Sequence, residues 1–446
     1  MIEHWTADGR LSGAGMKAQW KWMPAKIRIC THVTFVAFLM LALLVPTWRA
    51  GPFTWWPIGQ IPTQEGHTKG LGGLTLLPGL IVMSWLLYRL TEHPRRLWHW
   101  GRAAITWPLL GLTLLGLSSL EFALTWRPIA QGVGLGLTWF VYLFLVNERP
   151  ALAAPLALVV LVQGAVAVGQ FLNQHDLGLH ALGELHLDPH LPGASVLWAK
   201  GSCWLRAYGL TGHPNNLGAT MAILILWLFP YLEQAHGWRR VGLLLSLSVG
   251  CLGLLVSFSR ASWIAFLIGL ALWLHRGTRR EGFRWALLLL FGGGLWFYRD
   301  LVVARFFSPD IPTEARSLYE RLRDGYLALQ LVASYPWRGV GLGNYLAVAR
   351  SLQPDAFVVH NVSLLIAAEL GLPGAALWLW LTLAPLIQRW GIPFYRMAPW
   401  LAMHLIGLFD ITLWPTVTVR SAILFAIVAA TYAGQILPEE YHADRL

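Results

Sequence analysis

The sequence predicts an all-α integral membrane protein, and its composition and its long apolar runs are the two observations that indicate this class. Charged residues make up 12% of the 446 positions and apolar residues 56%, whereas a soluble domain has roughly a quarter charged residues. Apolar runs such as 71–90 and 151–171 reach the roughly 20 residues that a helix needs to cross a bilayer. These runs lack the alternation that is typical of membrane strands.

The apolar runs predict about twelve transmembrane helices in a single polytopic membrane domain, residues 1–446. Turn and breaker residues separate the runs, and no internal repeat is visible. The first 28 residues are basic and lack a signal-peptide cleavage pattern, so we expect the first span to be a retained anchor. The predicted spans are 30–48, 71–90, 103–124, 129–147, 151–173, 215–231, 241–258, 261–275, 284–298, 361–387, 396–414 and 418–435.

Basic residues in the short connections predict the orientation of these spans. With twelve spans, both termini and all of the Arg-rich short connections lie on one side, and the positive-inside rule makes that side the cytoplasm. Two long connections then face outward, a first outer loop at 174–214 and a large second outer loop at 299–360 with short helices. The Arg-rich short connections are 91–102, 232–240, 276–283 and 388–395.

Arginine is unusually frequent on the predicted outer side. Fourteen of the 33 Lys and Arg residues map there, and twelve of these fourteen are Arg. A solvated loop surface explains any single one of them equally well. However, a planar guanidinium binds phosphate through paired hydrogen bonds, whereas a Lys ammonium acts as a point charge. The bias toward Arg therefore indicates an outward cavity for a substrate that has phosphate groups and a lipid part.

Four motifs follow one another on this outer side. The glycines of the third motif predict a tight turn, and a helix is predicted before it, over 313–334, with Ser317 and Glu320 at capping-box spacing. The motifs are RAYGLTGHPN at 206–215, SFSRAS at 257–262, GVGLGNY at 339–345, and HN at 360–361 followed by Gly371 and Gly374.

In this order the motifs resemble the O-antigen ligase and polymerase superfamily, which includes lipopolysaccharide O-antigen ligases, O-antigen polymerases and O-linked oligosaccharyltransferases. By motif the resemblance covers residues 200–375, and by predicted topology the whole chain. It implies a GT-C-like glycosyltransferase that moves a glycan from an undecaprenyl diphosphate carrier to an acceptor hydroxyl. It further implies a multi-pass protein of the bacterial cytoplasmic membrane, with both termini cytoplasmic, a periplasmic or extracellular active site, and no metal or cofactor.

The resemblance also implies which residues act. The family's His after the large loop corresponds to His360, and its two outer arginines correspond to Arg206 and Arg321. Arg321 has the family's spacing from the proline that precedes the glycine motif, but Arg316 and Arg323 are close enough to be alternatives. The motifs do not separate ligase, polymerase and protein O-glycosylase from one another.

Physical chemistry supports a role for each of these residues. The leaving diphosphate gains charge as the glycosidic bond breaks, and fixed guanidinium groups stabilise that charge. An imidazole can take the proton of the acceptor hydroxyl. We therefore expect His360 to be the general base and Arg206 and Arg321 to bind the diphosphate. Further predicted substrate-binding residues are Arg260, Arg338, His213, Asn215, Asn361, Arg316 and Arg323.

Four histidines of the first outer loop raise the question of a metal site. His175, His180, His186 and His190 lie close in sequence, but Pro189 interrupts the spacing that would place the last two on one helical face. The chain also has no Asp-x-Asp pair, which a metal-dependent glycosyltransferase site would favour. We predict no metal site.

A transporter or flippase for lipid-linked glycans is the competing class of function. A transporter should have repeated halves and binding groups near the middle of the bilayer, whereas the polar groups of this chain gather on the predicted outer side.

Among the ionisable residues that border spans, Asp410 and Arg420 could form an ion pair. The expected partners are the lipid-linked donor, a lipid, glycan or protein acceptor, and membrane lipids, with no nucleic acid.

Overall fold

The structure, a computed structural model, describes residue 43 and residues 98–122, 127–275, 282–307, 312–388 and 391–435. The predicted spans 30–48 and 71–90 therefore lie outside the described residues, apart from Leu43. Every other predicted span contains a helix.

Most of the described residues are helical, and one β-hairpin interrupts the helices. The strands β1 (Val196–Ala199) and β2 (Ser202–Leu205) pair antiparallel, with Val196 opposite Leu205. The helices are α4 (Ala103–Ser118), η2 (Ser119–Phe122), α5 (Arg127–Glu148), α6 (Ala153–Asn173), η3 (His180–Leu182), α7 (Pro214–Gln234), α8 (Gly237–Val256), α9 (Arg260–Leu274), α10 (Gly282–Phe297), α11 (Arg299–Phe307), α12 (Pro312–Ser334), α13 (Tyr345–Leu352), α14 (Val362–Gln388), η4 (Phe394–Met397), α15 (Ala398–Gly407), α16 (Val419–Ala430) and η5 (Thr431–Gln435).

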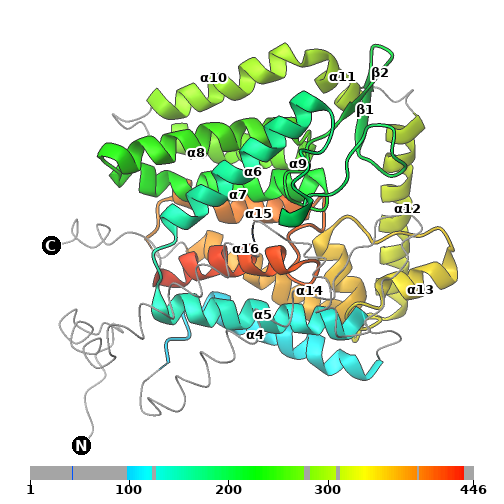
Figure 1. The fold of residues 1–446 in the computed structure, drawn as a ribbon. Coiled ribbons are helices and arrows are strands. Elements are labelled where there is room, and N and C mark those ends of the chain that lie inside the picture. Colours follow the sequence, from blue (N-terminus) through cyan, green and yellow to red (C-terminus); the bar gives the residue numbers. More distant parts are fainter. Residues whose placement is uncertain are drawn as a thin grey trace, which may run out of the picture.

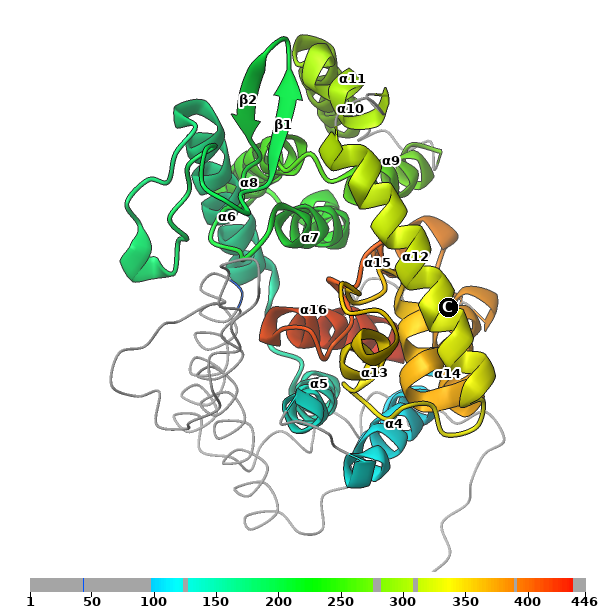
Figure 2. The ribbon, with the colours of Figure 1, turned by 90° about the vertical axis from the view of Figure 1, so that its right-hand side faces the viewer.

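The long helices pack side by side and share one apolar core. Contacts join α6 to α8, α5 to α16, α4 to α14 and α9 to α15. In Figure 1 these helices run across the view, while β1, β2, α11, α12 and α13 gather at their right-hand end. Figure 2 faces that end and shows α12 crossing it obliquely. We call it the loop end, because the long connections from α6 to α7 and from α10 to α14 both lie there.

The apolar helices fit a membrane protein in length. Five of the described helices are long and apolar enough to cross a membrane, namely α4 with the turn that follows it, α6, α7, α8 and α14. A sixth span is formed if α10 and α11, which meet at a bend of 80°, are counted together. The helical, apolar character is therefore confirmed, while the number of twelve spans and the GT-C-like fold stay predictions.

One predicted span is wrong in its length. The sequence predicts a helix over 396–414, but α15 ends at Gly407 and turns occupy residues 408–418. The Oδ1 atom of Asp410 accepts hydrogen bonds from both the backbone N–H and the hydroxyl of Thr412. Such a side-chain turn competes with helical hydrogen bonding. As a result, Asp410 lies in a turn beyond the end of α15.

The long helix α14 is broken at Gly371, where φ is 69° and ψ is −171°. The glycine motif at 339–345 fills this break. The N–H of Val340 donates to the carbonyl of Ala368 at 2.9 Å. The N–H of Gly341 donates to the carbonyl of Glu369, also at 2.9 Å. The motif thereby satisfies carbonyl groups that the break in α14 leaves without helical partners.

The glycines of this contact are explained by the close approach of two backbones. A Cβ on Gly339 would lie 2.4 Å from the carbonyl carbon of Glu369, and a Cβ on Gly371 would lie 2.6 Å from the backbone of Trp337. All three glycines of the motif have positive φ, which suits the predicted tight turn. The third and fourth motifs are therefore two halves of one packing unit.

The helix predicted over 313–334 is confirmed as α12, but the predicted capping box is not its start. α12 begins at Pro312, a residue type suited to the first turn of a helix. Its Leu327 and Leu331 are buried, whereas Leu322 and Tyr326 are exposed. α12 therefore packs by one side at the loop end and leaves an apolar side uncovered by the described residues.

Candidate functional site

Arg206 follows β2 and is buried at the loop end, with 5% of its surface exposed. Its Nε–H donates to the carbonyl oxygen of Ser257 at 3.0 Å, and its Nη2 donates to Oδ1 of Asn215 at 2.7 Å. Both acceptors are neutral oxygens, so these two bonds orient the guanidinium without cancelling its charge.

Asn215 connects Arg206 with a carboxylate from the far end of the sequence. Its Nδ2 donates to Oδ2 of Asp410 at 2.7 Å, while its Oδ1 accepts from the arginine. Asn215 lies in the first turn of α7, where its backbone N–H donates to Nδ1 of His213 at 3.1 Å. The predicted substrate-binding residues His213 and Asn215 therefore position each other at the start of this helix.

Asp410 is buried beside two imidazole groups. Burial by itself would raise the pKa of Asp410, but attraction to His360 and His213 and the hydrogen bonds from Thr412 hold it below its usual value. An ionised carboxylate next to an imidazole stabilises the imidazolium form. Asp410 is thus placed to stabilise a proton on His360.

A second carboxylate, that of Asp324 in α12, also interacts electrostatically with His360. Burial raises the pKa of Asp324, although Arg323 and the N–H of Phe357 donate hydrogen bonds that oppose this rise. Its Oδ2 atom has no hydrogen-bond partner within the described part of the chain. His360 therefore interacts with carboxylates from two separate segments, α12 and the turn after α15.

Asn361 fixes the beginning of α14 beside this group. Its Oδ1 accepts the N–H of Leu364 at 2.9 Å, as a capping side chain does, and its Nδ2 donates to the carbonyl of Leu408 at 3.0 Å. The second bond ties the start of α14 to the turn that contains Asp410. The HN motif thus combines a positioning amide with the adjacent imidazole.

The arginines of α12 differ in their contacts. Arg323 donates to Oδ1 of Asp324 at 2.9 and 3.0 Å and also pairs with Asp355. Arg321 is half-buried and makes no hydrogen bond or ion pair with any residue that the structure describes. The side chain of Arg316 lies outside the described residues. Two carboxylates therefore neutralise Arg323, whereas the charge of Arg321 stays available to a ligand.

Two other predicted substrate-binding arginines have different settings. Arg260 begins α9 and donates from Nη1 to the carbonyl of Arg305 at 3.0 Å, and Arg305 donates from Nε to the carbonyl of Phe258 at 3.2 Å. These bonds join α11 to the SFSRAS turn. Arg338 lies at the surface, with 77% of its side chain exposed and Glu121 at 3.8 Å. Arg260 therefore belongs to the framework around Arg206, while Arg338 faces solvent.

The SFSRAS turn packs closely against α7. Ser257, Ser259 and Ser262 are buried, and the hydroxyl groups of the last two lie 2.9 Å apart. A Cβ on Gly218 would lie 2.7 Å from the Cβ of Ser259, so only a glycine allows this approach. The turn that accepts a hydrogen bond from Arg206 is in this way held against the helix that contains Asn215.

Two buried glutamines outside the four motifs shape the backbone after Arg206. Oε1 of Gln170 accepts the N–H groups of Tyr208 at 3.0 Å and Gly209 at 2.8 Å, and Oε1 of Gln163 accepts the N–H of Leu210 at 2.8 Å. Both residues lie in α6. Their signal in the sequence is a polar side chain in an otherwise apolar predicted span.

The predicted ion pair between Asp410 and Arg420 is wrong. Asp410 accepts from Asn215, whereas Arg420 donates from Nη2 to the carbonyl oxygens of Leu43 at 2.7 Å and Leu210 at 3.5 Å. The turns that separate Asp410 from Arg420 in the chain direct the two side chains to different acceptors.

Hydrogen bonds join Arg206 to Asn215 and Asn215 to Asp410, and electrostatic attraction relates His360 to Asp410 and Asp324; we call these five residues the His360 network. The network contains a cation that can hold an anion and an imidazole that can take a proton, with carboxylates to stabilise the protonated form. Two of the three predicted catalytic residues belong to it. The third, Arg321, precedes Asp324 by one helical turn on α12.

Comparison with known families gives one match. Residues 243–379 match the family model described as O-antigen ligase. The match runs from α8 into α14, so it includes the SFSRAS turn, α12, the glycine motif and His360, but neither Arg206 nor Asp410. No curated protein matches the chain. Together with the apolar helices, the match indicates a bacterial membrane protein.

Proposed function

Because residues 243–379 identify the chain as a member of the O-antigen ligase superfamily, we propose that it is a lipid-dependent glycosyltransferase. It moves a glycan from an undecaprenyl diphosphate carrier to an acceptor hydroxyl, as a ligase or a polymerase does. The reaction takes place at the loop end, which the predicted orientation puts on the outer face of the cytoplasmic membrane.

The His360 network is the main support for this function. Arg206 is connected to Asp410 through Asn215, and Asp410 attracts His360. A phosphate-binding cation and a proton acceptor are thereby held in one framework. Arg321, which has no ion-pair partner among the described residues, adds a second cation from α12.

In the transfer step, His360 takes the proton of the acceptor hydroxyl. The acceptor oxygen forms a bond to the anomeric carbon of the glycan as the bond from that carbon to the diphosphate oxygen breaks. The electron pair of the broken bond stays with the leaving undecaprenyl diphosphate, and Arg206 and Arg321 bind its new negative charge. This direct displacement inverts the anomeric configuration. It needs no metal ion, because the two guanidinium groups stabilise the leaving group.

Asp410 and Asp324 act through His360 in this scheme. Their negative charges favour the imidazolium that forms when the acceptor loses its proton. Both carboxylates are almost fully buried, with 7% and 0% of their surfaces exposed. Since burial limits screening by water, their effect on His360 is larger than that of surface carboxylates.

The test uses the full chain reconstituted in vesicles with a glycan linked to undecaprenyl diphosphate and a hydroxyl acceptor. His360→Ala should lower the initial rate of glycan transfer by roughly 100- to 10,000-fold, the usual contribution of a positioned base. The matched control is His190→Ala at an exposed position of the first connection, which should leave the rate unchanged.

Two outcomes would contradict the proposal. One is a wild-type rate for His360→Ala, with binding of the donor and thermal stability also preserved. The other is movement of the intact donor across the bilayer without release of undecaprenyl diphosphate, which would assign the chain to the transporter class.

A further inference from the structure

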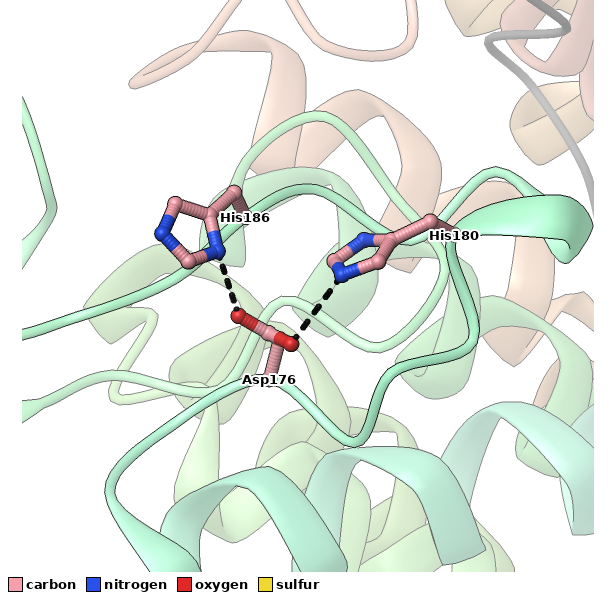
Figure 3. Close-up of side chains that lie close together, drawn as sticks. All are labelled: Asp176, His180 and His186. Atoms are coloured by element: carbon pink, nitrogen blue, oxygen red, sulfur yellow. Dashed lines mark hydrogen bonds and ion pairs between the residues drawn. The ribbon is translucent and has the colours of Figure 1, made fainter.

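A second group of imidazole and carboxylate side chains lies in the connection between α6 and α7. Asp176, His180 and His186 point toward one another there (Figure 3). Nδ1 of His186 is 2.9 Å from Oδ2 of Asp176, and Nε2 of His180 is 3.3 Å from Oδ1. One ligand atom from each residue lies within 4.8 Å of the other two.

The two ring nitrogens of His180 both face oxygen acceptors. Nδ1 is 3.3 Å from the carbonyl oxygen of Glu184, and Nε2 is 3.3 Å from the carboxylate of Asp176. A neutral imidazole has a single N–H, and neither oxygen can donate a proton. If that N–H points to Glu184, the lone pair of Nε2 faces a negatively charged oxygen. A metal cation between the two atoms removes this repulsion, whereas the other neutral tautomer removes it only by turning the lone pair of Nδ1 toward the carbonyl oxygen of Glu184.

Hydrogen bonds with the backbone already hold the group in place. Oδ1 of Asp176 accepts the N–H of Gly178 at 3.2 Å, and Oδ2 accepts the N–H of Leu187 at 3.1 Å. The contact of His180 with the carbonyl of Glu184 is the outer partner that a metal-bound histidine usually has. These contacts fix the carboxylate and one imidazole in the orientation that a metal ion requires.

The connection itself is built around Glu184, which is buried. Its carboxylate accepts the N–H groups of Leu177 at 2.8 Å and Leu179 at 2.6 Å, and the Nε2–H of Gln170 at 2.7 Å. Gln170 in turn accepts N–H groups from the backbone that follows Arg206. The three candidate ligands are therefore linked through Glu184 and Gln170 to the His360 network.

We propose that Asp176, His180 and His186 bind a divalent transition-metal ion of the Zn²⁺ type, with water as the remaining ligand. Two imidazoles and a carboxylate are a ligand set that Zn²⁺ takes, whereas Ca²⁺ and Mg²⁺ prefer oxygen ligands throughout. In a tetrahedral site with bonds of about 2.1 Å, ligand atoms lie about 3.4 Å apart. The present separations need only small side-chain rotations, which the exposure of His180 and His186, 51% and 74%, allows.

The bound ion has a structural role. It joins the two ends of the segment 176–186, which Glu184 holds against α6 and hence against the backbone after Arg206. It takes no part in the transfer step, and its binding does not depend on the proposed activity. Measurements of metal binding and protein stability therefore test the metal site independently of the proposed transfer activity.

The test uses the full chain in detergent, stripped with a chelator and titrated with Zn²⁺. Calorimetry and elemental analysis should give one Zn²⁺ ion per chain, and the ion should raise the Tm. His186→Ala and Asp176→Asn should each weaken binding at least about tenfold, as loss of one ligand from a small site does. His190→Ala and His175→Ala, which change histidines of the same connection outside the group, should leave affinity unchanged.

The double variant His180→Ala/His186→Ala keeps the result interpretable. It should lose the Zn²⁺-dependent rise in Tm while its Tm without metal stays close to that of the stripped wild type, because both side chains are largely exposed. Zn²⁺ binding of equal affinity in this variant would place the ion elsewhere and overturn the proposal. Absence of stoichiometric binding to the wild type would overturn it as well.

Discussion

The His360 network and the group formed by Asp176, His180 and His186, which we call the Asp176 group, use the same side-chain types but differ in their exposure to solvent. In the network Arg206, Asp324 and Asp410 are buried, while Asn215 and His360 are half-buried, and the members come from segments between Arg206 and Asp410. The Asp176 group comes from eleven consecutive residues, and its imidazoles are mostly exposed. Burying a charge is costly unless partner groups stabilise it. A buried network with fixed partners is therefore suited to stabilising charge that develops during a reaction. An exposed group stays hydrated and can exchange an ion with water.

The largest expected effect separates two arginines of α12. Under the proposed function, Arg321→Ala should lower the transfer rate by about 100- to 1,000-fold, because it removes one of the two cations proposed to bind the leaving group, and should leave Tm unchanged. Arg323→Ala should instead destabilise the protein by roughly 3 kcal/mol, because the buried carboxylate of Asp324 would lose its ion-pair partner. Transfer rates and thermal unfolding of both variants test this division. A stability loss confined to Arg321→Ala would reverse the two roles.

A smaller effect tests whether the carboxylates of the two regions differ in their contribution to the transfer rate. Asp410→Asn keeps the shape of the side chain but removes the charge beside His360, and should lower the transfer rate by about 10- to 100-fold. Asp176→Asn removes a carboxylate of the exposed group and should change the rate less than about twofold. Initial rates measured in the same vesicles, with Tm as a folding check, make the comparison. Equal losses would show that the regions do not differ in this respect.

The smallest expected effect concerns the link between the two regions. Glu184→Ala leaves the N–H groups of Leu177 and Leu179 without their acceptor, which should cost about 1–3 kcal/mol of stability. Zn²⁺ affinity should fall in this variant because the segment that presents the ligands loosens. Chemical denaturation and Zn²⁺ titration measure the two effects. A variant that loses neither would show that Glu184 does not organise the connection.

Several elements could be predicted because their signals are local. The apolar run of α6 and the breaker residues around it indicate a helix at 153–173. The motif that contains His360 indicates the region of the site because it resembles a family pattern. These signals depend on neighbouring residues in the chain, and a single sequence contains them.

The group of Asp176, His180 and His186 shows an arrangement that reasoning from local spacing does not anticipate. Spacing on a helix argued against His186 and His190 as joint ligands, since Pro189 lies between them. In the structure the grouped residues lie in turns, where helical spacing does not apply, and Asp176 completes the group. The turns are held by hydrogen bonds of Glu184 with Leu177 and Leu179 inside the segment and with Gln170 of α6, which also binds the backbone after Arg206.

By itself, the sequence determined that this chain is helical, apolar and related to O-antigen ligases, because composition, run length and motif order are properties of the linear chain. Only the tertiary structure decided that Asp410 binds Asn215 rather than Arg420, that Arg323 is neutralised while Arg321 is not, and that α14 breaks around the glycine motif. The physical reason is that hydrogen bonds, ion pairs and backbone contacts between distant segments depend on how the helices pack, and one sequence does not record that packing.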